Sequence, residues 1–202
     1  MKMSDCIHCK EFPCKDVLTD HFTAPDVVVD PHSIKMIMIS EGPSVHPNEN
    51  FYEPNSHEYM QATLQIFRDA GLDISNMNEI IHKGVYITTA IKCPKEGLSI
   101  STETVKNCSY ILEDELSVFT NIKVILLNGD VAIKAMNHIR KRQDGVRIIP
   151  AGSTYKIRKA KYEYRGIRYL PSYILTGKNL LIEKSKRKMI TEDIREVLKL
   201  IK

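Results

Sequence analysis

The cysteines are the residues of this sequence whose spacing most directly predicts chemistry. Three of them, Cys6, Cys9 and Cys14, fall within nine residues, and Cys93 and Cys108 follow far downstream with 14 residues between them. The first 14 residues are polar, where a secretory signal peptide needs an apolar stretch, and thiols in the cytoplasm are kept reduced. We therefore expect these cysteines to bind a metal or to pack in the core, in place of forming disulfides.

A carboxylate and a tight turn follow a short apolar run. The run Met36–Ser40 leads into Glu41, Gly42 and Pro43, a pattern that lets the backbone approach a ligand closely. Taken alone, Glu41 could equally cap a helix. A second apolar run, Val85–Thr89, is followed by Cys93. Both runs thus end close to a side chain that can do chemistry.

These residues need a scaffold that brings them together, and the apolar pattern predicts one. Short runs rich in β-branched residues predict buried strands, and apolar residues three and four apart predict helices between them. Strands that alternate with helices form a parallel sheet covered on both faces, so we expect a single three-layer α/β/α domain over residues 1–202. Ligands bind at the carboxyl ends of the strands in such folds. The expected strands are 36–40, 85–89, 124–127, 146–149 and 167–170, and the expected helices are 57–70, 102–119, 131–139 and 191–201.

Composition excludes several classes of protein. Apolar residues make up 43% of the 202 residues and charged residues 27%, with 9 Gly and 9 Pro, which excludes collagen-like and low-complexity chains. No apolar run approaches the roughly 18 residues needed to cross a bilayer. We expect a folded cytoplasmic monomer without a membrane partner.

Positive charge gathers in one stretch of the chain. The formal net charge is +4, which permits a polyanionic partner without requiring one. Residues 156–168 carry six Lys or Arg against the single acid Glu163, with tyrosines interleaved. Two interpretations remain open: a solvated face, or a surface that follows a phosphate backbone. The basic residues are Lys156, Arg158, Lys159, Lys161, Arg165 and Arg168.

In their order along the chain, these motifs resemble those of the uracil-DNA glycosylase superfamily, and most closely its iron-sulfur branch, often called family 4. That branch has an N-terminal Cys-x-x-Cys, a strand ending in Gly-Glu-x-Pro-Gly, a strand ending in Tyr-Ile-x-Asn-x-x-Lys-Cys, a fourth cysteine beyond it, and a C-terminal His-Pro-Ser. The resemblance implies hydrolysis of the N-glycosidic bond of uracil, or of another deaminated base, in DNA. The matching stretches are Cys6–Cys9, Ser40–Ser44, Tyr86–Cys93, Cys108, Val124–Gly129 and Leu170–Tyr173.

The resemblance implies a four-iron, four-sulfur cluster as cofactor. Its ligands would be Cys6, Cys9, Cys93 and Cys108, and residues 1–20 would form the segment that joins the cluster. Four thiolates satisfy such a cluster and would link regions far apart in sequence. Two alternatives remain open: Cys14 could replace Cys6 or Cys9, and zinc could occupy the same thiolates.

The resemblance also implies roles for residues around the first two strands. Glu41 would position water or offset positive charge on the sugar, in a loop where Gly42 and Ser44 contact the substrate. Phe51 would stack on the base, although a core role is equally compatible with its sequence. Thr89 would contact the base edge in place of the family's Asn, and a hydroxyl cannot offer the paired donor and acceptor of an amide.

The C-terminal motif departs further from the family. Leu170 stands where the family has the His that donates to the departing base, so Ser172, Tyr173 or a backbone N–H would have to take over that role. In the superfamily this segment wedges the DNA strands apart from the minor groove. Leu170, Pro171 and Ser172 would therefore contact the substrate, and Tyr173 and Lys178 would contact DNA.

Two rival functions follow from these departures. The loss of the family's Asn and His favours a non-catalytic relative that still binds DNA or a base. A zinc-stapled domain that binds a small phosphorylated ligand at the Glu41 loop, without contacting DNA, is the rival from a different class.

Overall fold

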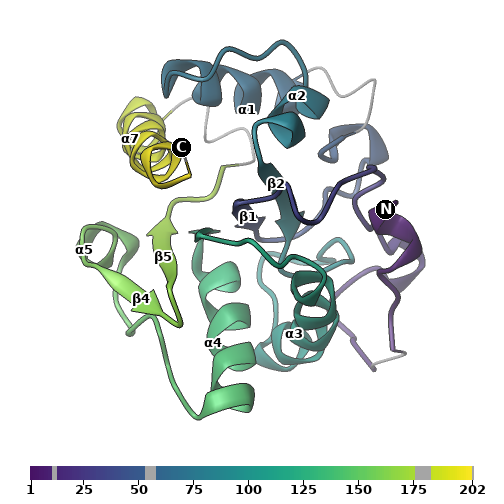
Figure 1. Cartoon of the computed structure of the whole chain (residues 1–202). Coiled ribbons are helices and arrows are strands. Elements are labelled where there is room, and N and C mark those ends of the chain that lie inside the picture. Colours follow the sequence, from purple (N-terminus) through teal and green to yellow (C-terminus); the bar gives the residue numbers. More distant parts are fainter. Residues whose placement is uncertain (11–12, 53–57, 176–182, 202) are drawn as a thin grey trace.

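A computed structural model shows a central five-stranded sheet with helices on both faces (Figure 1), and it describes residues 1–10, 13–52, 58–175 and 183–201. The strand order is β2-β1-β3-β5-β4. β1 pairs in parallel with β2 and β3, β3 pairs in parallel with β5, and β4 is antiparallel to β5. The strands are β1 (Met36–Ser40), β2 (Val85–Thr89), β3 (Val124–Asn128), β4 (Tyr162–Tyr164) and β5 (Ile167–Ser172).

The longer helices form two layers. In Figure 1, α1 (Glu58–Asp69), α2 (Met77–His82) and α7 (Lys184–Leu200) lie above the sheet, and α3 (Thr102–Ser117) and α4 (Asp130–Asp144) lie below it. The expected three-layer α/β/α architecture is thereby confirmed. The remaining elements are the short helix α5 (Thr154–Ile157) and the 3₁₀ turns η1 (Met3–Asp5), η2 (Thr19–His21) and η3 (Pro47–Glu49).

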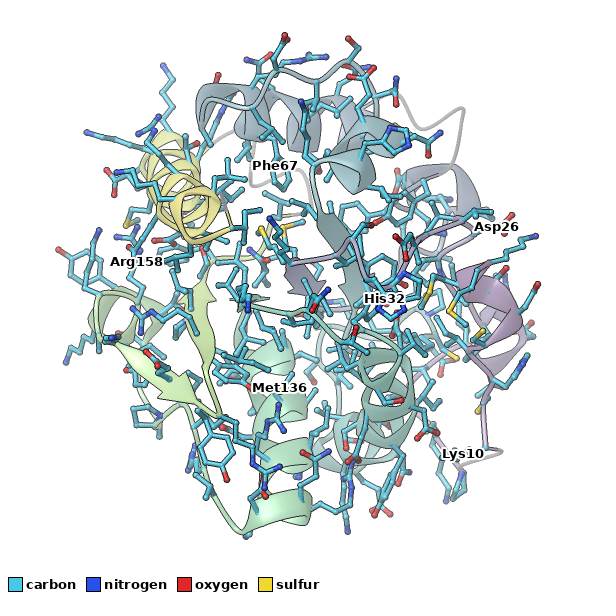
Figure 2. The ribbon with its side chains drawn as sticks, in the orientation of Figure 1. Lys10, Asp26, His32, Phe67, Met136 and Arg158 are labelled. Carbon is cyan, nitrogen blue, oxygen red and sulfur yellow. The ribbon has the colours of Figure 1, made fainter. Side chains whose placement is uncertain are left out.

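Alternate residues of each buried strand supply two separate cores. In β1, Met36 and Met38 pack in the cluster that includes Phe67 of α1, whereas Ile37 and Ile39 pack in the cluster that includes Met136 of α4. Phe67 and Met136 are fully buried and lie in opposite helical layers (Figure 2). Burial on both faces explains why these strands are continuous apolar runs.

The expected strand at 146–149 is wrong. Ile148 and Ile149 donate their N–H groups to the Asn137 side chain of α4, and Asn137 donates in turn to the Ile149 carbonyl, so this run pairs with a helix side chain. In place of this run, β4 is the strand that completes the sheet of five. β4 connects to β5 through a turn with positive φ at Arg165 (50°) and Gly166 (75°). No helix in the described part of the chain is long and apolar enough to span a membrane.

The N-terminal segment is tied to the rest of the fold by two isolated β-bridges. Lys2 pairs with Val28, and Val17 pairs with Lys95 just beyond β2. Asp16 extends this contact, because its carboxylate accepts hydrogen bonds from Ser101 and Thr104 at the start of α3. Burial alone would raise the pKa of the Asp16 carboxyl, but these hydrogen bonds bring the pKa below its usual value.

Candidate active site

A cavity of about 260 Å³ opens at the carboxyl ends of β1 and β2. The sequence predicted the nearby loops as the ligand-binding edge, and five of the predicted site residues line this cavity together: Glu41, Gly42, Ser44, Phe51 and Thr89. The residues of the lining that the sequence motifs did not identify include Asn50, Ile91, Lys95, Ile100 and Ile174. The cavity is near the lower end of the sizes usual for small-molecule sites, about 300 to 1,000 Å³.

The Glu41 turn is held against the exit of β2. Ala90 donates its N–H to the Ser40 carbonyl at 2.8 Å, and Ile91 donates to the Glu41 carbonyl at 3.1 Å, so the pairing of β1 and β2 continues past both strands. A Cβ atom on Gly42 would stand 2.7 Å from Cγ1 of Ile91, well inside van der Waals contact. Glycine fits this position because the turn lies directly against the Ile91 side chain.

The loop between Ser44 and Tyr52 presents the aromatic ring at the cavity. Ser44 donates its N–H to Oδ1 of Asn50 at 3.1 Å and its hydroxyl to the Glu49 carboxylate, which closes the loop on itself. Phe51 follows and lines the cavity, whereas the next residue, Tyr52, turns inward at a φ of 74°. The Tyr52 hydroxyl accepts the Ile87 N–H of edge strand β2 at 2.7 Å, and burial raises the pKa of this phenol well above its usual value.

The cavity holds an ion pair. Nζ of Lys95 lies 2.9 Å from Oε1 of Glu41, and the two side chains are 43% and 20% exposed. Lys95 is the one basic side chain among the described residues that line the cavity. The contact with Glu41 joins residues 54 positions apart, so nothing in the sequence indicated that Lys95 lies in the cavity beyond its position just after Cys93 and Pro94.

A second, fully buried ion pair supports the floor of the cavity. Nζ of Lys92 lies 2.5 Å from Oε2 of Glu115 on α3, and it also donates to the Thr89 carbonyl at 2.7 Å and to the Thr88 hydroxyl at 2.8 Å. The Tyr86 hydroxyl donates to the other Glu115 oxygen at 2.7 Å. This network fixes the backbone of Thr89, which lines the cavity and is 8% exposed.

The structure does not bring Leu170, Pro171 or Ser172 to the cavity lining. Leu170 lies inside β5 opposite Leu126, is 1% exposed and packs in the core below α1 and α7. Side chains alternate between the two faces of β5, and the Leu170 side chain points into the core. Leu170 is therefore not exposed, and the prediction that it acts as a wedge between DNA strands is wrong. Pro171, opposite Leu127, lies within the same strand.

Ser172 is fully buried, and its hydroxyl donates to Oδ2 of Asp193 at 2.6 Å. Asp193 also accepts from Arg158, which lies between α5 and α7 (Figure 2). This hydroxyl is therefore engaged in joining β5 to α7, which corrects the expectation that Ser172 contacts substrate.

The residues that follow Ser172 differ in exposure. Tyr173 is half-buried, with the Lys186 ammonium 5.9 Å from its ring centre, and Lys178 lies outside the described residues. Ile174 is 41% exposed and lines the cavity, so it is the apolar side chain that this segment presents there. The sequence alone could not single out Ile174, because strand alternation had to be known first.

The basic stretch at 156–168 is divided between the interior and the surface. Arg158 is buried in the pair with Asp193, and Arg168 approaches Glu196 of α7 at 3.7 Å. Lys159, Lys161 and Arg165 are exposed, each near a carboxylate. Part of the stretch is therefore structural, and the strand order places β4 at the opposite edge of the sheet from β2.

Cysteines from three segments of the chain, Cys14, Cys93 and Cys108, lie close together in what we call the cysteine corner. Cys93 and Cys108 are buried together with Val17 and Ile91, and Cys14 packs against them. Burial, together with smaller contributions from negative charge on neighbouring cysteines, raises the pKa of Cys93 to about 12 and that of Cys108 to about 11.

Cys6 and Cys9 are both exposed, and the Cys6 Sγ faces the Lys2 carbonyl at 3.7 Å. Among the residues that the structure describes, no three metal-ligating side chains are spaced closely enough to hold an ion. The chemistry of the donor set, which is entirely thiol, nevertheless suits iron-sulfur or zinc binding.

Comparison with known proteins gives one match across most of the chain. The sequence pattern of the uracil DNA glycosylase superfamily matches residues 28–195. No protein of curated function matches. Two similar solved structures are the wild-type UNG of Nitratifractor salsuginis, with 12% identity over 83% of this chain and 75% of that chain and a TM-score of 0.39, and a point mutant of the same UNG, with 12% identity over 83% and 76% and a TM-score of 0.37.

Proposed function

Because the chain belongs to the uracil DNA glycosylase superfamily, we propose that it removes uracil, or another deaminated base, from DNA by hydrolysing the N-glycosidic bond. One observation carries this proposal: a carboxylate, an aromatic ring and a hydroxyl, from Glu41, Phe51 and Thr89, line one cavity at the sheet edge. A glycosylase needs these groups to orient water, to stack on the base and to read the base edge.

The lining residues have separate tasks in this reaction. The target base leaves the DNA stack and enters the cavity, where the Phe51 ring offers a face for stacking. The Thr89 hydroxyl can donate or accept one hydrogen bond at the base edge. Glu41 orients the attacking water and offsets the positive charge that develops on the sugar. Ile174, exposed beside the cavity, is the apolar side chain suited to fill the gap in the stack.

The test is a panel of duplex and single-stranded oligonucleotides that contain uracil, hypoxanthine or xanthine, each treated with alkali after incubation to reveal abasic sites. We expect the wild-type protein to produce scission at one of these bases and Glu41→Gln to lose most of it. If the wild type binds DNA without scission, the protein is better explained as a non-catalytic relative. The observation that supports this alternative is that Leu170 stands where the family has a His.

We also propose that the cysteine corner holds a four-iron, four-sulfur cluster, with Cys9, Cys14, Cys93 and Cys108 as ligands. The packing of Cys14 against Cys93 and Cys108 supports this set, and the Cys6 Sγ donates instead to the Lys2 carbonyl. Because the thiols must lose their protons to bind, loading would release protons and draw the N-terminal segment closer. When bound, the group would link residues 1–20 to the exit of β2 and to α3.

Two serine variants distinguish the ligand sets. Protein purified without oxygen is assayed for iron, sulfide, zinc and absorption in the violet. We expect Cys14→Ser to lose the iron and Cys6→Ser to retain it. If Cys6→Ser loses the iron and Cys14→Ser retains it, the family's ligand set with Cys6 is the correct one. A colourless wild-type protein with one equivalent of zinc would show that the site binds zinc and no iron-sulfur cluster.

A further inference from the structure

The cavity lacks the histidine that its superfamily motif calls for, and the Ser172 hydroxyl does not replace it. Breaking the N-glycosidic bond develops positive charge on the sugar and negative charge on the base. A donor aimed at the base is therefore needed as well as a carboxylate near the sugar. Leu170 is apolar and buried, and the Ser172 hydroxyl is bound to Asp193.

Lys95 is the strongest donor that the cavity presents. Its ammonium has three N–H donors, and the contacts in the described part of the chain are to Glu41 at 2.9 Å and to the Leu98 carbonyl at a long 3.5 Å. The ammonium is accessible, because the side chain is 43% exposed. It can therefore bind a substrate oxygen while it remains beside Glu41.

The backbone of Lys95 is held in place by the N-terminal segment. Val17 forms a β-bridge with Lys95, and the flanking hydrogen bonds run from Leu18 N–H to the Pro94 carbonyl at 2.9 Å and from Glu96 N–H to the Asp16 carbonyl at 3.0 Å. The side chain thus starts from a fixed strand-like position two residues after Cys93. This anchoring favours a preorganised group over a freely moving surface lysine.

We propose that Lys95 is a catalytic residue of this site, which donates a hydrogen bond to a carbonyl oxygen of the departing base and stabilises the base anion. The inference rests on the proposed glycosylase function. Glu41 and Lys95 then place a negative and a positive charge side by side, matching the charge separation of the transition state.

The bond changes balance without a further reactant. The electron pair of the bond between C1′ of the sugar and the base nitrogen leaves with the base, which becomes an anion. Water supplies the oxygen that bonds to C1′ and releases a proton, and solvent returns a proton to the base. Lys95 keeps its own proton and acts through charge and hydrogen bonding.

The experiment compares single-turnover cleavage by the wild type, Lys95→Gln and Lys95→Arg, with DNA binding measured separately. We expect Lys95→Gln to lower the cleavage rate by roughly a hundred- to a thousand-fold, as removal of one transition-state donor does, and Lys95→Arg to retain most of the rate. The matched control is Lys2→Gln. Lys2 also pairs with a carboxylate at 2.9 Å and is 47% exposed, and we expect its variant to cleave like the wild type.

A leaving-group comparison separates catalysis from positioning. 5-Fluorouracil leaves as a more stable anion than uracil and needs less help, so Lys95→Gln should lose less rate on it than on uracil. Equal losses on both bases, or weaker DNA binding with an unchanged single-turnover rate, would assign Lys95 to positioning or to a phosphate contact and overturn the inference. If the wild type releases no base from DNA containing uracil, hypoxanthine or xanthine, the proposed function falls and this inference with it; if Lys95→Gln cleaves at the wild-type rate, only this inference falls.

Discussion

At the scale of single residues, the cavity combines a few groups whose positions are set by backbone pairing. Glu41 is fixed because its carbonyl accepts the Ile91 N–H, and Lys95 is fixed because Val17 pairs with it. The two side chains approach to 2.9 Å, Glu41 from the end of β1 and Lys95 from the segment that follows β2. A partly exposed ion pair of this kind adds little to stability.

The burial of Leu170 leads to a prediction about Leu170→His. Restoring the family's histidine would place an imidazole in an apolar core, where an unsatisfied polar group costs about 1–3 kcal/mol. We expect the free energy of unfolding to fall by that amount, measured by urea denaturation, and base cleavage not to rise. A variant as stable as the wild type that cleaves uracil faster would show that position 170 reaches the cavity.

At the scale of elements, the exit of β2 is fixed to α3 by the buried pair of Lys92 and Glu115. Both side chains are fully buried, and the pair is surrounded by the hydroxyls of Tyr86 and Thr88. A buried charge is tolerated when its partner and its hydrogen bonds are in place. This network positions the Thr89 carbonyl and, six residues on from Thr89, Lys95.

Removal of one charge should therefore be far more harmful than removal of both. We expect Lys92→Met to lower the free energy of unfolding by about 3–5 kcal/mol, because it leaves Glu115 buried without its partner. The double variant Lys92→Met with Glu115→Leu should recover much of that loss. Thermal and denaturant unfolding of the two single variants and the double variant provide the measurement, and additive losses would contradict a coupled pair.

The elements themselves were largely predictable because their signals are local. The apolar runs of β1, β2 and β3 identify strands buried on both faces, and the parallel arrangement then places Glu41 and Thr89 at one edge. The run at 146–149 is also rich in β-branched residues but pairs with Asn137, a contact that no local pattern reveals. The antiparallel β4 escaped prediction because it is short and only partly buried.

At the scale of the whole molecule, the cysteine corner adjoins the cavity, because Ile91 and Ile100 pack with the thiols and also line the cavity. Cys14 precedes Val17 by three residues, and Cys93 precedes Lys95 by two, so the thiols flank the pairing that anchors Lys95. Lys95 and Ile174, which line the cavity and which the sequence did not single out, depend on contacts between distant segments. Spacing within a motif predicts which types of residue are present, but the choice between Cys6 and Cys14, or between Leu170 and Ile174, requires the fold.

The most direct test of the glycosylase account is the release of free base from DNA. Uracil-, hypoxanthine- and xanthine-containing oligonucleotides are incubated with the purified wild-type chain, and the small-molecule fraction is analysed by mass spectrometry together with a count of abasic sites. We predict one equivalent of free base for each abasic site formed, for at least one of the three substrates. Tight binding to these oligonucleotides with no base released from any of them would contradict the account.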